Sequence, residues 1–385
     1  MDMPPEKNNI PESNKTDQGK PIRVLHVFAS LDRGGAEAMI MSLYRAIDRS
    51  KIQFDFVVNA SDCDYAYEEE IRALGGRIYR IPRYRVVNLF EYRKSWIKLL
   101  KAHPEWRVVH GHHTAPASVY IPIVRRMGQA TIAHSQNSLV KENRVKWLMR
   151  KIVLFPVRYQ ADHLFACSKL AGEWMFGSSA DFRVINNAIN ASDFVFSSIE
   201  RKRIRSEFDI GDSFLIGHVG SFSEQKNHAF LLEVFRDIYK RDADAKLLLV
   251  GDGPLRLELE SLVKKYGIED RVIFAGVRSD IPALLSAMDL FLFPSFHEGL
   301  PVALVEAQAN GLPIVASDAI SNEVKITDLI EFISLGNQTG YWADRVLKCD
   351  NTREHGNFSA KIRSAGYDIE QNAAMIEEFY LSAVN

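Results

Sequence analysis

The chain has little cysteine and no long apolar run, and each absence excludes a class of protein. Its three cysteines, Cys63, Cys167 and Cys349, stand far apart and lack the spacing of metal ligands. A scattered, odd set of this kind excludes a disulfide framework and fits a reducing compartment. No uninterrupted apolar stretch reaches the length that spans a bilayer. Residues 1–20 are polar and lack the apolar region of a signal peptide, so we expect a disordered leader and a cytoplasmic protein.

The chain also lacks an excess of charge of either sign, but its basic residues are unevenly placed. The formal net charge is −1, which excludes a global attraction to nucleic acid. Between residues 76 and 160, however, seventeen Lys and Arg face only three Glu. Two stretches there, 86–98 and 144–151, mix basic, aromatic and aliphatic residues at helical spacing. They suit adsorption to the anionic inner face of a plasma membrane and a lipid-linked acceptor. Ordinary amphipathic helices with a solvated basic face are an equally weighted alternative.

The chain does contain a repeated alternation of short apolar strands with helices. Its 385 residues can bury two ordinary cores. The alternation is typical of parallel βαβ units and restarts near residue 214, so we predict an α/β fold with two Rossmann-like doubly wound domains that face a central cleft. Helices are expected at 36–47, 67–74 and 90–103, and strands at 22–28, 54–58, 77–81, 106–111, 130–134 and 161–167, then at 215–220, 246–250, 272–276, 290–294 and 313–317.

We divide the chain after its leader into three parts. The N-terminal domain is expected over residues 21–190, the C-terminal domain over 191–365, and a last helix over 366–385 that can return to the N-terminal domain. The polar, basic stretch 190–211 is the expected linker. Open parallel sheets bind ligands outside the carboxyl ends of their strands, so two facing sheets place both sets of loops on one cavity.

The sharpest chemical pattern is a pair of glutamates around a Gly-Leu-Pro turn. Glu298 precedes a helix start and Glu306 lies along the helix. Proline suits a first helical turn, and the free backbone N–H groups at the helix N-terminus form a cradle for a diphosphate. Glu306 can then accept hydrogen bonds from a ribose diol, while Glu298 can hold hydroxyl groups of a sugar. Two glutamates at this spacing are, without further signals, more often a helix cap and a surface residue. The surrounding segments decide between that alternative and a binding site. The cradle comprises Gly299, Leu300, Pro301 and Val302.

Together with residues 219–228, this pattern resembles the donor site of the family-4 retaining glycosyltransferases, which have the GT-B fold. The resemblance runs from about Ile22 to Ala343 and is strongest to bacterial enzymes that build exopolysaccharide or capsule. It implies that Lys226 neutralises the charge of the leaving diphosphate. It also assigns the N-terminal domain to the acceptor and the C-terminal domain to the nucleotide sugar. The family usually carries an arginine where this chain has Ser221, so one cation is missing.

Three weaker segments fit the same family pattern. Gly34 and Gly35 open the first helix of the N-terminal domain, where glycines let a phosphate or an acceptor approach the backbone. Asn187 lies in a segment similar to the family's turn before the second domain. Val277 and Arg278 follow a strand where the family holds the nucleotide base, mainly through backbone groups.

Among the histidines, His134 is the residue that the resemblance places opposite the donor sugar. The alternative is a hydrogen-bonded core histidine. His110, His112 and His113 surround one glycine and suggest a metal site. No carboxylate or cysteine accompanies them, and the chemistry of this fold normally needs no ion, so we expect neither a metal nor a cofactor.

These features predict a retaining hexosyltransferase that uses a nucleotide diphosphate sugar, with UDP as the expected nucleotide. The acceptor is expected to be a glycan or a lipid-linked glycan in surface polysaccharide synthesis. No residue stands out as a covalent nucleophile, so we expect a same-face displacement in which the leaving phosphate takes the acceptor proton. His134, Lys226 and Glu298 are the expected catalytic residues.

Two other functions remain open at this stage. A nucleotide-sugar epimerase can share the architecture and would turn over without an acceptor. A two-domain sugar-binding protein would need export. A dinucleotide oxidoreductase is disfavoured because neither half has a G-x-G-x-x-G segment after its first strand.

Overall fold

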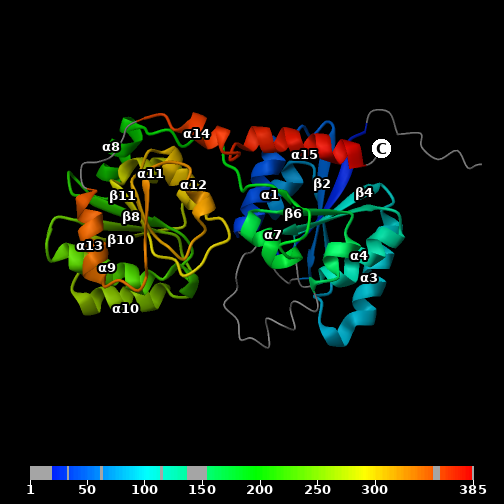
Figure 1. The fold of residues 1–385 in the computed structure, drawn as a ribbon, viewed down its shortest axis with the longest axis horizontal. Coiled ribbons are helices and arrows are strands. Elements are labelled where there is room, and N and C mark those ends of the chain that lie inside the picture. The colour runs from blue at the N-terminus through cyan, green and yellow to red at the C-terminus, as the bar shows by residue number, and fades with distance from the viewer. Residues whose placement is uncertain are drawn as a thin grey trace, which may run out of the picture.

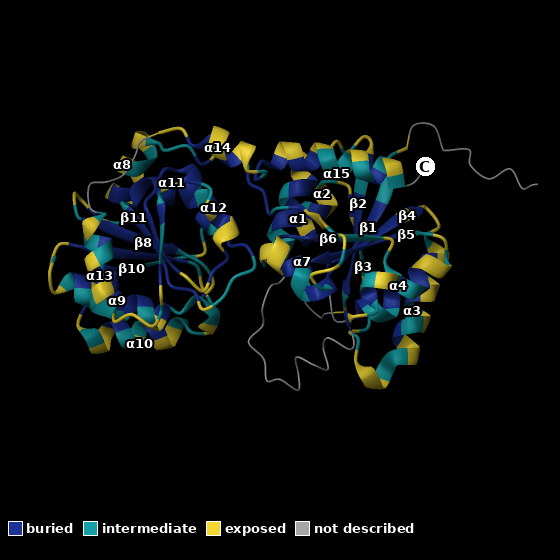
Figure 2. Cartoon of the chain, viewed as in Figure 1, coloured by how far each residue is buried: buried dark blue, intermediate teal, exposed yellow. Residues whose placement is uncertain are grey.

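The chain folds into two parallel β-sheets, each covered by helices on both faces (Figure 1). The computed structural model describes residues 20–32, 34–60, 64–112, 116–136, 154–349 and 356–383. The predicted α/β fold with two doubly wound domains is confirmed. Burial is deepest in the strands of both halves, and exposed residues follow the outer faces of the helices (Figure 2).

The N-terminal sheet has seven strands in the order β3-β2-β1-β4-β5-β6-β7. Successive side chains of a strand point to opposite faces, so Val24 enters the core on one face of the sheet and Leu25 the core on the other. Parallel neighbours need a crossover, which the helices supply. The elements are β1 (Ile22–Val27), α1 (Gly35–Ala46), β2 (Ile52–Asn59), α2 (Glu68–Ala73), β3 (Arg77–Ile81), α3 (Leu89–Ala102), β4 (Trp106–Gly111), α4 (Ala117–Arg126), β5 (Ala130–Ser135), α6 (Val157–Gln160), β6 (His163–Ala166), α7 (Lys169–Phe176) and β7 (Arg183–Val184).

The C-terminal sheet has six parallel strands in the order β10-β9-β8-β11-β12-β13. Its four inner strands are mostly apolar and almost wholly buried, as expected for a sheet with helices on both faces, whereas the edge strands β10 and β13 are partly exposed. The elements are α8 (Ser198–Glu207), β8 (Leu215–Val219), α9 (His228–Tyr239), β9 (Lys246–Val250), α10 (Arg256–Tyr266), β10 (Val272–Gly276), α11 (Ile281–Ala287), β11 (Leu290–Phe293), α12 (Val302–Ala309), β12 (Ile314–Ser317), β13 (Ile330–Ile333), α13 (Thr339–Lys348) and α14 (Ser359–Ser364). The last helix is α15 (Ile369–Ala383), which returns to the N-terminal half.

Most predicted strands and helices occur close to their predicted bounds, but the linker prediction was wrong for residues 198–207. These residues form α8, which packs against α11 of the C-terminal half. Its Arg201 and Arg205 contact the two carboxylate oxygens of Asp289 at 2.6 and 3.2 Å. The basic residues that suggested a linker therefore fix a helix to the C-terminal half through ion pairs with Asp289. The sequence also failed to predict β7 and β13, which are short.

The last helix, α15, lies against the N-terminal sheet, beside α1 (Figure 1). Its Tyr380 is buried in the same apolar core as Phe54 of β2, and Lys51 pairs with Glu377 at 2.7 Å. The segment before it runs beside the earlier crossover between the halves, where Ile189 and Asp368 form a parallel bridge. Two stretches of chain therefore join the halves side by side. Within the described residues, no helix is both long and apolar enough to cross a membrane.

Candidate active site

A cavity of about 460 Å³ lies between the two halves, at the carboxyl ends of their strands. This size is typical of small-molecule sites. The N-terminal half contributes residues after β1, β4 and β5 and from the start of α1, and the C-terminal half contributes the loops after β8 and β11. The lining residues are Phe28, Ala29, Gly35, Ala36, Glu37, His112, Gln136, Asn187, Ser221, Gln225, Lys226, Glu298, Gly299, Leu300, Pro301 and Val302.

Lys226 and Glu298 form the charged centre of this cavity. The lysine Nζ lies 2.7 Å from Glu298 Oε1 and 4.7 Å from the centre of the Phe293 ring. Gln225 Nε2 donates to Glu298 Oε2 at 3.1 Å and to the carbonyl oxygen of His297 at 2.9 Å. These contacts fasten the loop after β8 to the loop after β11. Two side chains that the sequence assigned to different parts of a ligand thus bind each other.

The loop after β11 leads into α12, whose N-terminus forms one wall of the cavity. Helix α12 begins at Val302, and Pro301 is its N-cap residue, so the proline lies just before the first helical turn. Pro301 has no N–H group, so the backbone donors of the predicted cradle are residues 299, 300 and 302 and not 301. The first amides of a helix lack intrahelical partners and lie at the positive end of its dipole. This wall can bind an anion.

Glu306 lies one turn further along α12 and does not line the cavity. It is four residues after Val302, so both side chains lie on the same helix face, about 6 Å apart along the axis. Burial raises the pKa of its carboxyl group to about 7. Among the described residues, no side chain or backbone group hydrogen-bonds this carboxylate. It is therefore a half-buried acceptor that a polar ligand group can satisfy.

The side chain of Glu37, in the first turn of α1, lies against Gly34 at the start of that helix. A Cβ atom at Gly34, the N-cap residue, would collide with the carboxylate of Glu37, whereas one at Gly35 would meet nothing. Burial, with a smaller contribution from Asp32, raises the pKa of the Glu37 carboxyl group. Glu37 lines the cavity, a position that we did not predict from the sequence. Its position in the first turn of a helix after a strand could have indicated it.

Of the other predicted site residues, Asn187 and Ser221 line the cavity, whereas Val277 and Arg278 do not. The Asn187 Oδ1 atom is buried without a partner among the described residues. Val277 is largely exposed after β10, and the Arg278 guanidinium group binds Asp280 and Glu207.

His112, and not the predicted His134, lies at the cavity wall. His134 is buried on β5, behind the lining residues, and its Nδ1 atom lies 3.1 Å from His110 Nε2. Burial lowers its pKa to about 3. His112, directly after β4, lines the cavity and stacks on Phe28 with ring centres 4.4 Å apart. Its Nδ1 atom lies 3.2 Å from Gln136 Nε2. The position of His112 at a strand end could have identified it from the sequence.

Comparisons with known proteins agree on one family. The model for glycosyl transferases group 1 matches residues 200–347, and the model for glycosyltransferase family 4 matches residues 33–193. The putative glycosyltransferase EpsF of Bacillus subtilis is 34% identical over 93% of this chain and 96% of its own length. The capsular polysaccharide biosynthesis glycosyltransferase CapH of Staphylococcus aureus is 24% identical over 94% and 99%.

Solved structures show the same fold at lower identity. Anabaena HepE, in a crystal structure with UDP and glucose, superimposes with a TM-score of 0.77. The match covers 94% of this chain and all of HepE, at 19% sequence identity.

Proposed function

Since this chain belongs to glycosyltransferase family 4, we propose that it transfers a hexose with retention from a UDP-sugar to a glycan or lipid-linked acceptor in surface polysaccharide synthesis. The observation that carries this proposal is the shared cavity, where Lys226, Glu298 and the N-terminus of α12 meet. A relative named for capsular polysaccharide biosynthesis and a structural neighbour solved with UDP and glucose support the substrate class.

The C-terminal half offers groups for each part of a nucleotide diphosphate sugar, some of them beyond the cavity wall. The amides at the start of α12 and the Lys226 ammonium group would bind the diphosphate. Glu306 lies about 6 Å along the helix from Val302, a separation that suits a ribose next to the α-phosphate. Its unpaired carboxylate would accept hydrogen bonds from the ribose diol. Ser221 offers no positive charge, so the Lys226 side chain would neutralise most of the negative charge of the diphosphate. The backbone near Val277 and Arg278 would contact the base.

The sugar would lie between Glu298 and the N-terminal wall. Binding of the diphosphate gives Lys226 a second anionic partner and loosens its hold on Glu298, whose oxygens can then accept sugar hydroxyl groups. Across the cavity, Asn187 Oδ1 and Gln136 Oε1 are buried without partners among the described residues, and sugar hydroxyls would satisfy them. In this arrangement His112 faces the sugar and His134 supports the wall through His110.

Transfer with retention would proceed on the face that the nucleotide leaves. Lys226 and the α12 amides would stabilise the departing diphosphate, which would accept the proton of the attacking hydroxyl group. Neither a metal nor a cofactor takes part in this mechanism. The glycines at the start of α1, with Glu37, would border the acceptor.

A panel of UDP-, GDP- and ADP-sugars tests the activity. All assays contain a chelator. UDP-hexoses are expected to release nucleotide faster when a glycan or polyprenyl-diphosphate-sugar acceptor is present than when water is the only acceptor. NMR of the product is expected to show the anomeric configuration of the donor. Inversion, or turnover that needs no acceptor, would contradict the proposal.

An exposed apolar tip on the basic N-terminal half supports a lipid-linked acceptor. Val86, Val87 and Phe90 are 82%, 91% and 86% exposed, just before and at the start of α3. Arginines and lysines flank them in sequence. The second stretch predicted to bind membranes, 144–151, lies outside the described residues.

Vesicle co-sedimentation tests this surface. The wild type is expected to pellet with anionic vesicles at low salt and less at high salt, because surface charges are screened. Val87→Asp/Phe90→Asp is expected to pellet less than the wild type. Leu257→Asp, a change at an exposed residue of α10 in the other half, is the matched control. Equal pelleting of all three proteins, or none by the wild type, would contradict membrane adsorption.

A further inference from the structure

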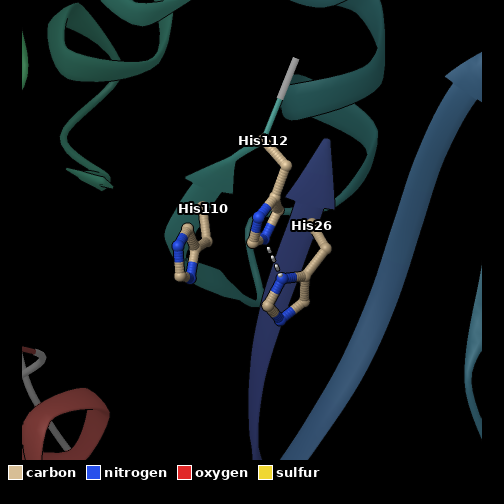
Figure 3. Close-up of side chains that lie close together, drawn as sticks. All are labelled: His26, His110 and His112. Atoms are coloured by element: carbon tan, nitrogen blue, oxygen red, sulfur yellow. Dashed lines mark hydrogen bonds between the residues drawn. The ribbon is translucent and has the colours of Figure 1, made fainter. Parts of the chain in front are cut away.

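Three buried histidines, His26, His110 and His112, lie close together in the N-terminal half, with His112 at the cavity wall (Figure 3). We refer to them as the histidine cluster. His26 on β1 and His110 on β4 are direct neighbours in the register of the two parallel strands. His112 follows two residues later and therefore projects to the same side as His110. The sequence shows His110 and His112 together, but only the pairing of β1 with β4 adds His26.

The ring nitrogens of the cluster lie close enough for one metal ion. One nitrogen from each histidine lies within 4.8 Å of the others, and His26 Nδ1 is 3.2 Å from His112 Nε2. Zinc–nitrogen bonds of about 2.1 Å at tetrahedral angles separate the ligand atoms by about 3.4 Å. The His26–His112 pair, now hydrogen-bonded, is close to this separation, and the nitrogen of His110, within 4.8 Å, would move closer on binding.

The three rings are also wholly inside the protein, with at most 7% of each residue exposed. A neutral imidazole ring offers one lone pair to a metal ion.

Groups outside the cluster hold two of the rings by their Nδ1 atoms. Gln136 lies 3.2 Å from His112 Nδ1, and the Tyr380 hydroxyl lies 2.6 Å from His110 Nδ1. Contacts to the second ring nitrogen are usual around metal-bound histidines, because they fix the ring orientation. Both nitrogens of His110 are hydrogen-bonded, to Tyr380 and His134, so a bound ion would replace one of these contacts.

We propose that His26, His110 and His112 bind one imidazole-preferring transition-metal ion, such as Zn²⁺. Three histidines leave one position of a tetrahedral ion for water or an anion. His112 is the member of the cluster that lines the cavity, so this position opens toward it. An anionic oxygen there would offset the charge of the ion. Mg²⁺ and Ca²⁺ prefer oxygen ligands and would not bind. The ion is not a cofactor of the transfer; its occupancy would restrain the wall that faces the sugar.

Titration of the tag-free full chain with Co²⁺ tests the site without any sugar nucleotide. After chelator treatment, the wild type is expected to bind one equivalent of Co²⁺, with the visible d–d absorption of a tetrahedral ion. Zn²⁺ should abolish this absorption and Mg²⁺ should not. A strong thiolate charge-transfer band would identify a cysteine ligand and overturn the proposal, as would the absence of saturable binding by folded wild-type protein.

Variants distinguish the cluster from other histidines. His26→Gln and His112→Gln should each weaken Co²⁺ binding at least tenfold, by the loss of one ligand. His163→Gln, on β6 of the same sheet and outside the cluster, should bind as the wild type does. Near-ultraviolet circular dichroism checks that each variant folds; a variant that does not fold is set aside, and the wild-type titration and the other variant decide. Equal affinity of a folded cluster variant and the wild type would overturn the assignment.

Discussion

Substitution of Glu306 by Gln tests the nucleotide site through its pH dependence. Burial raises the pKa of this carboxyl group from 4.5 to about 7. If only the carboxylate accepts the ribose hydroxyl groups, affinity follows its ionised fraction. That fraction falls from about 0.9 at pH 8 to about 0.1 at pH 6, so affinity for a UDP-sugar should fall about tenfold, or about 1.4 kcal/mol.

Calorimetric titration with UDP-glucose between about pH 6 and 8 measures this change, and the phosphates of this ligand do not titrate in that range. Glu306→Gln is expected to bind more weakly at pH 8 and to show a flat profile. Glu258→Gln, at an exposed position of α10, should keep the wild-type profile. A tenfold pH dependence that survives in Glu306→Gln would refute the role of this carboxylate.

The same substitution should change stability in the opposite direction. The unfolded state ionises Glu306 near pH 4.5 and the folded state near 7, so between these values the folded protein binds more protons and loses stability as the pH rises. Glu306→Gln removes this loss. The free energy of unfolding should therefore exceed that of the wild type by up to about 3 kcal/mol at pH 8, and little at pH 4.5. Urea unfolding at both pH values measures the difference, and an equal effect at both would contradict the pKa assignment.

Two further substitutions test the charged centre and the glycine pair. Lys226→Met leaves Glu298 without its ammonium partner and should lower the free energy of unfolding in urea by roughly 1–3 kcal/mol. Adding Glu298→Gln to this variant should restore stability but not UDP-sugar binding. Recovery of both would contradict a diphosphate-binding role for the lysine. Gly34→Ala should displace the Glu37 carboxylate and slow transfer in steady-state kinetics. Gly35→Ala, where a Cβ meets no atom of the chain, should slow transfer less. Equal effects would show that the contact between Gly34 and Glu37 does not matter for transfer.

The sequence by itself determined the two halves and much of the C-terminal wall. Alternation of apolar strands with helices reflects contacts within a few residues, so the periodicity was enough to predict both parallel sheets. The segment from Glu298 to Val302 was recognisable because a proline, a glycine and a helix start occur together within one short stretch. The role of Lys226 came instead from the resemblance of residues 219–228 to the family's donor site, and it stays a prediction.

Only the tertiary structure decided which side chains meet. Strand order places β1 beside β4, so His26 lies near His110 although 84 positions separate them. The approach of two loops pairs Lys226 with Glu298, and burial brings the pKa of Glu306 close to neutrality. The register of β5 places His134 behind the cavity wall. Distances and burial of this kind depend on long-range packing, which no local pattern in the chain encodes.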